Sequence, residues 1–149
     1  KAKHIHSWSI GKGRITLAES RRMTESRHQQ AVIKWSEQAS IRQKWPCLKL
    51  LHHIPNERQC SPAQGKLLKL LGVRRGVPDL DLPVARGKYH GLRIEMKDED
   101  GRTSPDQDWW LGELREQGYF AECCHGWHSA VRVIEWYLEL GPFHEGNHE

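Results

Sequence analysis

Hydrophobic and polar residues alternate with two different periods along the chain, and each period predicts a type of secondary structure. Apolar residues at every third or fourth position predict helices, whereas short alternating or continuous apolar segments predict strands. A capping residue such as Thr24, or a Ser-Pro pair, marks a helix start, and Gly72 and Gly118 mark helix ends. In chain order, the predicted elements are a helix over 24–45, a strand over 47–54, a helix over 63–71, strands over 79–84 and 92–97, a helix over 105–117, a strand over 119–124 and a helix over 129–140.

The order of these elements, α-β-α-β-β-α-β-α, predicts one α/β domain. Helices that alternate with a few short strands favour a small mixed β-sheet flanked by helices. The sequence has no internal repeat that would indicate a second domain. We expect a basic N-terminal arm over residues 1–23, the folded domain over 24–141 and a short tail over 142–149.

Composition narrows the class of protein. The chain has 149 residues, of which 37% are hydrophobic and 28% are charged, which is typical of one globular domain. No apolar segment approaches the roughly 18 residues that a membrane span requires. The N-terminus lacks the apolar region of a secretory signal. We therefore expect a cytoplasmic protein with no membrane partner.

The four cysteines predict reduced, buried thiols rather than a disulfide framework. No two of them have the Cys-x-x-Cys spacing that is typical of a zinc site. An alternative is a structural zinc site built from Cys123, Cys124, His125 and His128, which would make the chain an interaction domain.

Charge is distributed unevenly between the two halves of the chain. Residues 1–75 carry 16 Lys and Arg against 4 Asp and Glu, a net charge of +12, and residues 76–149 carry 7 against 15, a net charge of −8. The basic half favours a polyanionic partner, and the acidic half favours a cation site. The alternative is that both are solvated surface.

Two carboxylates and one lysine are the strongest candidates for chemistry. Glu95 and Lys97 are two residues apart on a predicted strand, so that their side chains leave the same face. A turn before this strand returns the chain and brings Asp79 beside Glu95. Two carboxylates that face one point, with the carbonyl of Met96 as a further ligand, suit a hard divalent cation such as Mg2+. The alternative is a solvated Glu-x-Lys pair on an exposed face.

These residues and the short motifs around them resemble the VRR-NUC (virus-type replication-repair nuclease) family of PD-(D/E)xK nucleases. Pro78-Asp79 and Glu95-Met96-Lys97 match the PD-(D/E)xK signature. The resemblance extends from about Glu25 to Leu138 and implies a restriction-endonuclease-like core. The further matching motifs are Thr24-Glu25 with Gln29, Ile54-Pro55-Asn56, Gly72-Val73, Gly76-Val77-Pro78-Asp79-Leu80, Leu92-x-Ile94-Glu95-x-Lys97, Gly101-x-x-Ser104-x-x-Gln107 and Gly118-Tyr119.

The resemblance implies a metal-dependent endonuclease that hydrolyses phosphodiester bonds in DNA with Mg2+, and also with Mn2+. Asp79, Glu95 and Lys97 would carry the catalytic roles, with the lysine orienting or activating water and offsetting charge on the phosphate. Glu25 would contact the metal through water or hold a second ion. Gln107 would touch Lys97 or the substrate.

The family resemblance also implies branched DNA as the substrate and a phage or bacterial source. By analogy with junction resolvases, we expect a homodimer that resolves Holliday junctions, because two symmetric cuts need two equivalent sites. The alternatives are a nuclease for flaps or splayed arms and a non-catalytic nucleic-acid-binding module. The residues expected to contact DNA phosphates are Lys12, Arg14, Arg21, Arg22, Arg27, Lys66, Lys69, Arg74 and Arg75.

Overall fold

The computed structural model describes residues 9–10, 13–14, 23–55 and 61–144. Within the predicted arm, β1 (Ser9–Ile10) and β2 (Gly13–Arg14) form an antiparallel pair. Three of the predicted DNA-contacting residues, Lys12, Arg21 and Arg22, lie outside the described residues, and the side chain of Arg14 is not described.

The predicted mixed sheet is confirmed, with four strands in the order β3-β4-β5-β6. Strand β4 pairs antiparallel with both β3 and β5, whereas β5 and β6 are parallel and are connected through helix α5. In chain order the strands are β3 (His52–His53), β4 (Leu80–Leu82), β5 (Leu92–Lys97) and β6 (Phe120–His125).

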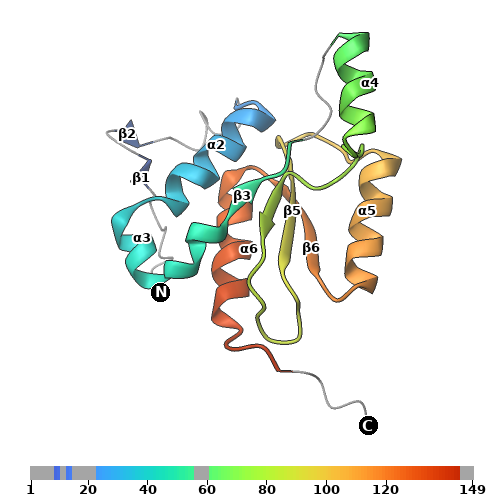
Figure 1. The fold of residues 1–149 in the computed structure, drawn as a ribbon. Coiled ribbons are helices and arrows are strands. Elements are labelled where there is room, and N and C mark those ends of the chain that lie inside the picture. The colour runs from blue at the N-terminus through green and yellow to red at the C-terminus, as the bar shows by residue number, and fades with distance from the viewer. Residues whose placement is uncertain (1–8, 11–12, 15–22, 56–60, 145–149) are drawn as a thin grey trace.

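Helices cover the sheet on both sides of its central strands (Figure 1). Helices α2 (Glu25–Ser36) and α6 (Trp127–Glu139) pack against each other and against β5, and α5 (Pro105–Glu116) packs against β6. Helix α4 (Pro62–Leu70) stands beyond the end of the sheet, near the start of α5 (Figure 1). No helix in the described part of the chain is both long and apolar enough to cross a membrane.

The core lies between α2, α6 and one face of the sheet. Trp35, Trp127 and Tyr137 are its largest fully buried side chains, and alternate residues of β5 complete it. Because side chains alternate along a strand, the intervening residues of β5, which include Glu95 and Lys97, leave the other face. The strand therefore separates the apolar core from the polar site.

The single helix predicted over 24–45 is wrong. The chain forms α2 and then a separate helix, α3 (Ala39–Lys44), because Gln38 adopts an extended conformation between them. The apolar stripe of α2 is buried, whereas α3 buries only Ile41 among its own residues. The break between α2 and α3 changes the direction of the chain. The apolar periodicity is continuous across this position, so the sequence pattern did not predict the break.

The strand predicted over 47–54 is mostly wrong as well. Residues Pro46–Leu50 form a 3-10 helix, η1, and only His52–His53 pair with β4. A short apolar run beside a proline has no period that separates the two structures. The final helix begins two residues earlier than predicted, at Trp127, after Gly126 with a φ of 76°.

Gly76 holds the segment that leads to Asp79 against the first turn of α5. Its φ is +81°, and a Cβ atom there would lie 2.6 Å from the backbone carbon of Asp106. We expect Gly76→Ala to lower the free energy of unfolding by about 2–4 kcal/mol, since both strain and overlap must be relieved. Unfolding in urea measures the change.

Gly112 provides a matched control within α5. A Cβ atom there meets nothing within 4 Å, so Gly112→Ala should stabilise the protein by about 0.5–1 kcal/mol through helix propensity. Equal stability of the Gly76→Ala variant and the unsubstituted protein would show that this contact does not fix the segment.

Candidate metal centre

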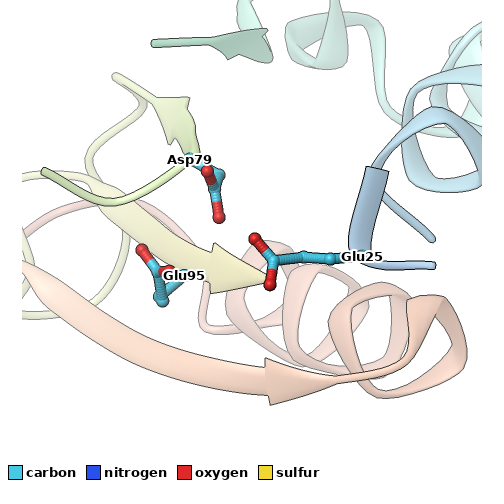
Figure 2. Close-up of side chains that lie close together, drawn as sticks. All are labelled: Glu25, Asp79 and Glu95. Atoms are coloured by element: carbon cyan, nitrogen blue, oxygen red, sulfur yellow. The ribbon is translucent and has the colours of Figure 1, made fainter. Parts of the chain in front are cut away.

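Three carboxylates from separate elements meet at the end of the sheet. Glu25 is the first residue of α2, Asp79 directly precedes β4, and Glu95 lies within β5. One carboxylate oxygen of each residue lies within 4.8 Å of the others, and Figure 2 shows the three side chains approaching one another. The positive end of the α2 dipole, capped by Thr24, favours a carboxylate at the position of Glu25.

Asp79 is fixed by hydrogen bonds on both sides. Its Oδ2 accepts from the backbone N–H of Met96 at 2.9 Å. Its carbonyl oxygen accepts from the backbone N–H of Ile54 at 2.8 Å and lies 2.8 Å from Nδ1 of His53. The neighbouring strands therefore hold this carboxylate before any ligand binds.

Glu95 has one satisfied and one unsatisfied oxygen. The residue is only 1% exposed. Its Oε1 accepts from Lys97 Nζ at 2.6 Å and from Gln107 Nε2, whereas its buried Oε2 has no hydrogen-bond partner. Burial, followed by the nearby charge of Asp79, raises the pKa of Glu95 to about 7, although Lys97 opposes the shift.

Lys97 lies among the carboxylates as a buried cation. Its Nζ donates to Glu95 Oε1, to Glu25 Oε2 at 3.2 Å and to the carbonyl of Met96 at 3.1 Å. Burial alone lowers the pKa of Lys97, but the hydrogen bond and charge of Glu95, together with Glu25, outweigh it and raise the pKa above its ordinary value. The lysine is therefore protonated at neutral pH.

Gln107 was expected to touch Lys97 or the substrate, and in the structure its side chain contacts Glu95. Its backbone N–H donates to Ser104 Oγ at 3.4 Å, and its Oε1 accepts from the backbone N–H of Ser104 at 2.8 Å, which completes a capping box at the start of α5. Its Nε2 is left to donate to Glu95. Ser104 thus orients Gln107, a role that the Ser-x-x-Gln spacing signals but that we did not predict.

This donor set fits a hard divalent cation. Carboxylate oxygens are the ligands that such ions prefer, and the unpartnered Oε2 of Glu95 is a buried acceptor that a cation would satisfy. The carbonyl of Met96 contacts Lys97 Nζ, so its use as a ligand remains a prediction. The geometry favours a metal held by the side chains of Glu25, Asp79 and Glu95.

The alternative zinc site finds no support in the geometry. Cys123 and Cys124 are adjacent on β6, and only Cys124 belongs to the core. Burial raises the pKa of both thiols, to about 12 for Cys124. Within the described ranges, the group able to hold a metal is the carboxylate triad.

The five predicted DNA-contacting residues whose side chains are described come from two parts of the chain. Arg27 is exposed on the first turn of α2. Lys66, Lys69, Arg74 and Arg75 are exposed on α4 and on the segment between α4 and Asp79. Arg75 is partly engaged, because its Nε lies 3.8 Å from Asp106 Oδ2.

Metal binding at this site is expected to weaken below neutral pH. Because the pKa of Glu95 is raised to about 7, the carboxyl group is mostly protonated at pH 6, and a metal ion must displace that proton. We expect the apparent affinity for Ca2+ to be about tenfold lower at pH 6 than at pH 8, measured by titration calorimetry. Equal affinities for Ca2+ at the two pH values would contradict the site. The control is Asp100→Asn, which changes an exposed turn carboxylate and should keep the tenfold difference.

The same raised pKa has a consequence for stability in the presence of EDTA. The folded protein binds a proton at Glu95 more tightly than the unfolded chain, whose ordinary value is 4.5. The contribution of Glu95 to stability is therefore lost as the pH rises from about 4.5 to about 7. A metal ion would offset this loss.

Comparisons with known proteins identify a single family. The model of the VRR-NUC domain family matches residues 23–128, which is most of the chain. A solved structure described as a VRR_NUC domain protein is similar in sequence and fold, with 36% identity and a TM-score of 0.70. The match covers 82% of this chain and 93% of that one. No curated protein matches the chain.

Proposed function

Because the chain belongs to the VRR-NUC family of PD-(D/E)xK nucleases, we propose that it is an Mg2+-dependent endonuclease that cleaves branched DNA at the carboxylate triad. The family establishes a nuclease domain and DNA as its substrate. The metal, the residue roles, the branched substrate and the dimer are parts of the proposal.

The observation that carries this proposal is the buried, unpartnered Oε2 of Glu95 within the carboxylate triad. A non-catalytic DNA-binding module would gain nothing from it, because an unpartnered buried oxygen costs stability, and three carboxylates beside a single lysine leave an excess of negative charge that repels phosphate. When Mg2+ is bound, it supplies a Lewis acid that polarises the scissile phosphate and stabilises the leaving oxygen. The triad is therefore better explained by catalysis than by binding.

The residues around the triad divide the remaining work. Lys97 is a cation beside the carboxylates, where it offsets negative charge on the phosphate. To orient a water molecule as well, it exchanges its longest contact, the one with Glu25 at 3.2 Å. Gln107 fixes the carboxylate of Glu95 through Oε1, which leaves Oε2 without a partner and available to a metal ion. Glu25 completes the triad, directly or through water.

Exposed cations would bind the DNA backbone on either side of this centre. We assign Arg27, Lys69, Arg74 and Arg75 to phosphate contacts, because a polyanion is attracted to cations that have no buried ion pair. Lys66 was predicted to make a similar contact and is also exposed on α4.

Replacing Arg74 and Arg75 together by alanine is expected to weaken DNA binding for all sequences and to flatten its dependence on salt. Each phosphate contact contributes about 0.9 to the slope of log affinity against log salt, so the slope should fall by about 1–2. Binding titrations from 50 to 200 mM salt measure it. Arg132→Ala on α6 is the control, and an unchanged slope in the double variant would exclude both contacts.

Cleavage assays on four substrates test the proposed function. A labelled four-way junction, a flap, a splayed arm and a plain duplex are incubated with Mg2+, with Mn2+ and with EDTA. We expect paired symmetric cuts in the junction, made by a homodimer, with either metal ion but not with EDTA. Cuts confined to the flap or splayed arm would replace the junction as substrate, and no metal-dependent cleavage would contradict the nuclease.

A further inference from the structure

Helix α4 exposes a stripe of leucines that the described residues leave uncovered. Leu67, Leu70 and Leu71 keep 55%, 76% and 72% of their surface exposed, and α4 has no buried residue. Positions three and four apart lie on the same side of a helix, so the three side chains form one leucine stripe. Exposed apolar stripes of this kind mark interaction sites.

The helix is too short to owe its stability to its own sequence. It has nine residues, whereas isolated helices below about 12 residues are marginal in water. Its start is well capped, by a capping box between Ser61 and Gln64 and by Pro62 at the first position. Capping fixes where α4 begins, but burial of the leucine stripe by a partner would supply the missing packing.

Helix α5 presents a complementary surface at the same edge of the molecule. Trp109 is 59% exposed, and three exposed carboxylates share its side of the helix by the spacing of three and four. We call this surface the acidic α5 face; its residues are Asp106, Trp109, Glu113 and Glu116.

The charges of the two surfaces are opposite. Residues 61–75 contain four cations and no carboxylate, whereas the acidic α5 face contains three carboxylates and no cation. Of the four cations, Lys66 is the one not assigned to a phosphate contact, and it remains for the partner. Within one chain, Arg75 and Asp106 already form such a contact where the end of the α4 segment meets the start of α5. Two α4 helices facing each other would bring like charges together, and DNA would be repelled by the acidic α5 face.

We infer that a second copy of this chain covers the leucine stripe, with α4 of one protomer packed on the acidic α5 face of its partner and the reverse contact formed by the same rotation. A two-fold axis forms both contacts at once, because each contact is repeated with the roles of the protomers exchanged. Within one chain, helix α4 stands near the start of α5 (Figure 1), where Arg75 lies beside Asp106. Lys66 borders the leucine stripe and meets the carboxylates of the partner. This inference rests on the proposed homodimer and assigns its interface.

Two substitutions of opposite charge at one position test the inference. Leu70 is exposed, so neither Leu70→Glu nor Leu70→Lys should disturb folding. Against an acidic surface, Leu70→Glu should raise the dimer dissociation constant at least tenfold more than Leu70→Lys does. Leu50→Glu, at a similarly exposed leucine in η1, should leave the dimer unchanged. Light scattering across a dilution series measures the mass.

Mixing two variants tests which surfaces meet. Leu70→Glu and Trp109→Glu should each be monomeric alone, but a mixture retains one intact contact, between α4 of the second variant and α5 of the first. A heterodimer in the mixture is the expected result. A mixture that stays monomeric would overturn the pairing of α4 with α5.

Other outcomes would overturn the proposed interface and leave the proposed nuclease activity unaffected. A monomeric unsubstituted protein, or a Leu70→Glu variant with an unchanged dissociation constant, would remove the interface. Greater disruption by Leu70→Lys than by Leu70→Glu would replace it with contact between two α4 helices. The mass of the protein is measured without DNA or metal, so failure of the interface and failure of the proposed nuclease activity can be distinguished.

Discussion

Replacing Asp79 by asparagine is expected to reduce metal-dependent DNA cleavage about a thousandfold, which corresponds to about 4 kcal/mol of transition-state stabilisation. The change removes one charged ligand from the triad. The amide oxygen of asparagine still accepts from the backbone N–H of Met96, so the fold is preserved. Single-turnover cleavage of a labelled substrate with Mg2+ measures the rate.

A DNA-binding measurement and a matched substitution distinguish the loss of catalysis from misfolding of the variant. Affinity for DNA in EDTA should be unchanged or slightly tighter in Asp79→Asn, because a negative charge near phosphate has been removed. Asp100→Asn changes an exposed turn carboxylate and should cleave at the normal rate. Cleavage within threefold of normal by Asp79→Asn would show that this carboxylate is not a metal ligand.

Replacing Lys97 by methionine is expected to destabilise the protein in EDTA at pH 8 by about 2–4 kcal/mol. The change leaves buried Glu95 without its cation, beside Asp79 and Glu25. The loss should be much smaller at pH 6, because Glu95 then takes up a proton. Ca2+ should restore most of the stability at pH 8 by replacing the lost charge. Cleavage with Mg2+ should fall at least a hundredfold.

Urea unfolding at the two pH values, with EDTA or Ca2+, checks this pattern. Lys44→Met breaks an exposed pair with Glu139 and a contact over the Trp45 ring, and it should lower stability by about 1 kcal/mol or less, to the same extent at both pH values and with or without Ca2+. A Lys97→Met variant whose stability does not depend on pH or Ca2+ would contradict the electrostatic account of the site.

The central pair of the site could be predicted because it follows from local pairing. In the antiparallel register of β4 and β5, Leu80 faces Ile94 and Asp81 faces Arg93, so one further step places Asp79 opposite Glu95. Two residues later on the same face comes Lys97. The turn, the alternation of side chains along each strand and the register of the hairpin all depend on residues close together in the chain. A single sequence therefore contains enough information to predict this pair.

The remaining site residues depend on packing that a single sequence does not specify. Glu25 reaches the triad only because α2 packs on α6 and β5. Gln107 reaches Glu95 only because the parallel pairing of β5 and β6 sets the path of α5. Family resemblance pointed to both residues, but it did not reveal that Gln107 holds Glu95.

Two elements were predicted wrongly for a related reason. Helix α3 continues the apolar pattern of α2, yet Gln38 is extended between them. The segment 46–50 is apolar enough for a strand but forms η1 against the core through Leu48. In both places tertiary contacts override the local pattern. The helix over α4 was predicted, but its lack of packing was not.

The most direct test of the central claim is to locate a metal ion in crystals soaked with Mn2+, by anomalous scattering. The account predicts one strong peak among Glu25, Asp79 and Glu95, bonded to Glu95 Oε2, with no peak at that position in Asp79→Asn crystals. A peak at the cysteine and histidine residues 123–128 instead, or none at the triad at saturating Mn2+ and pH 8, would contradict it.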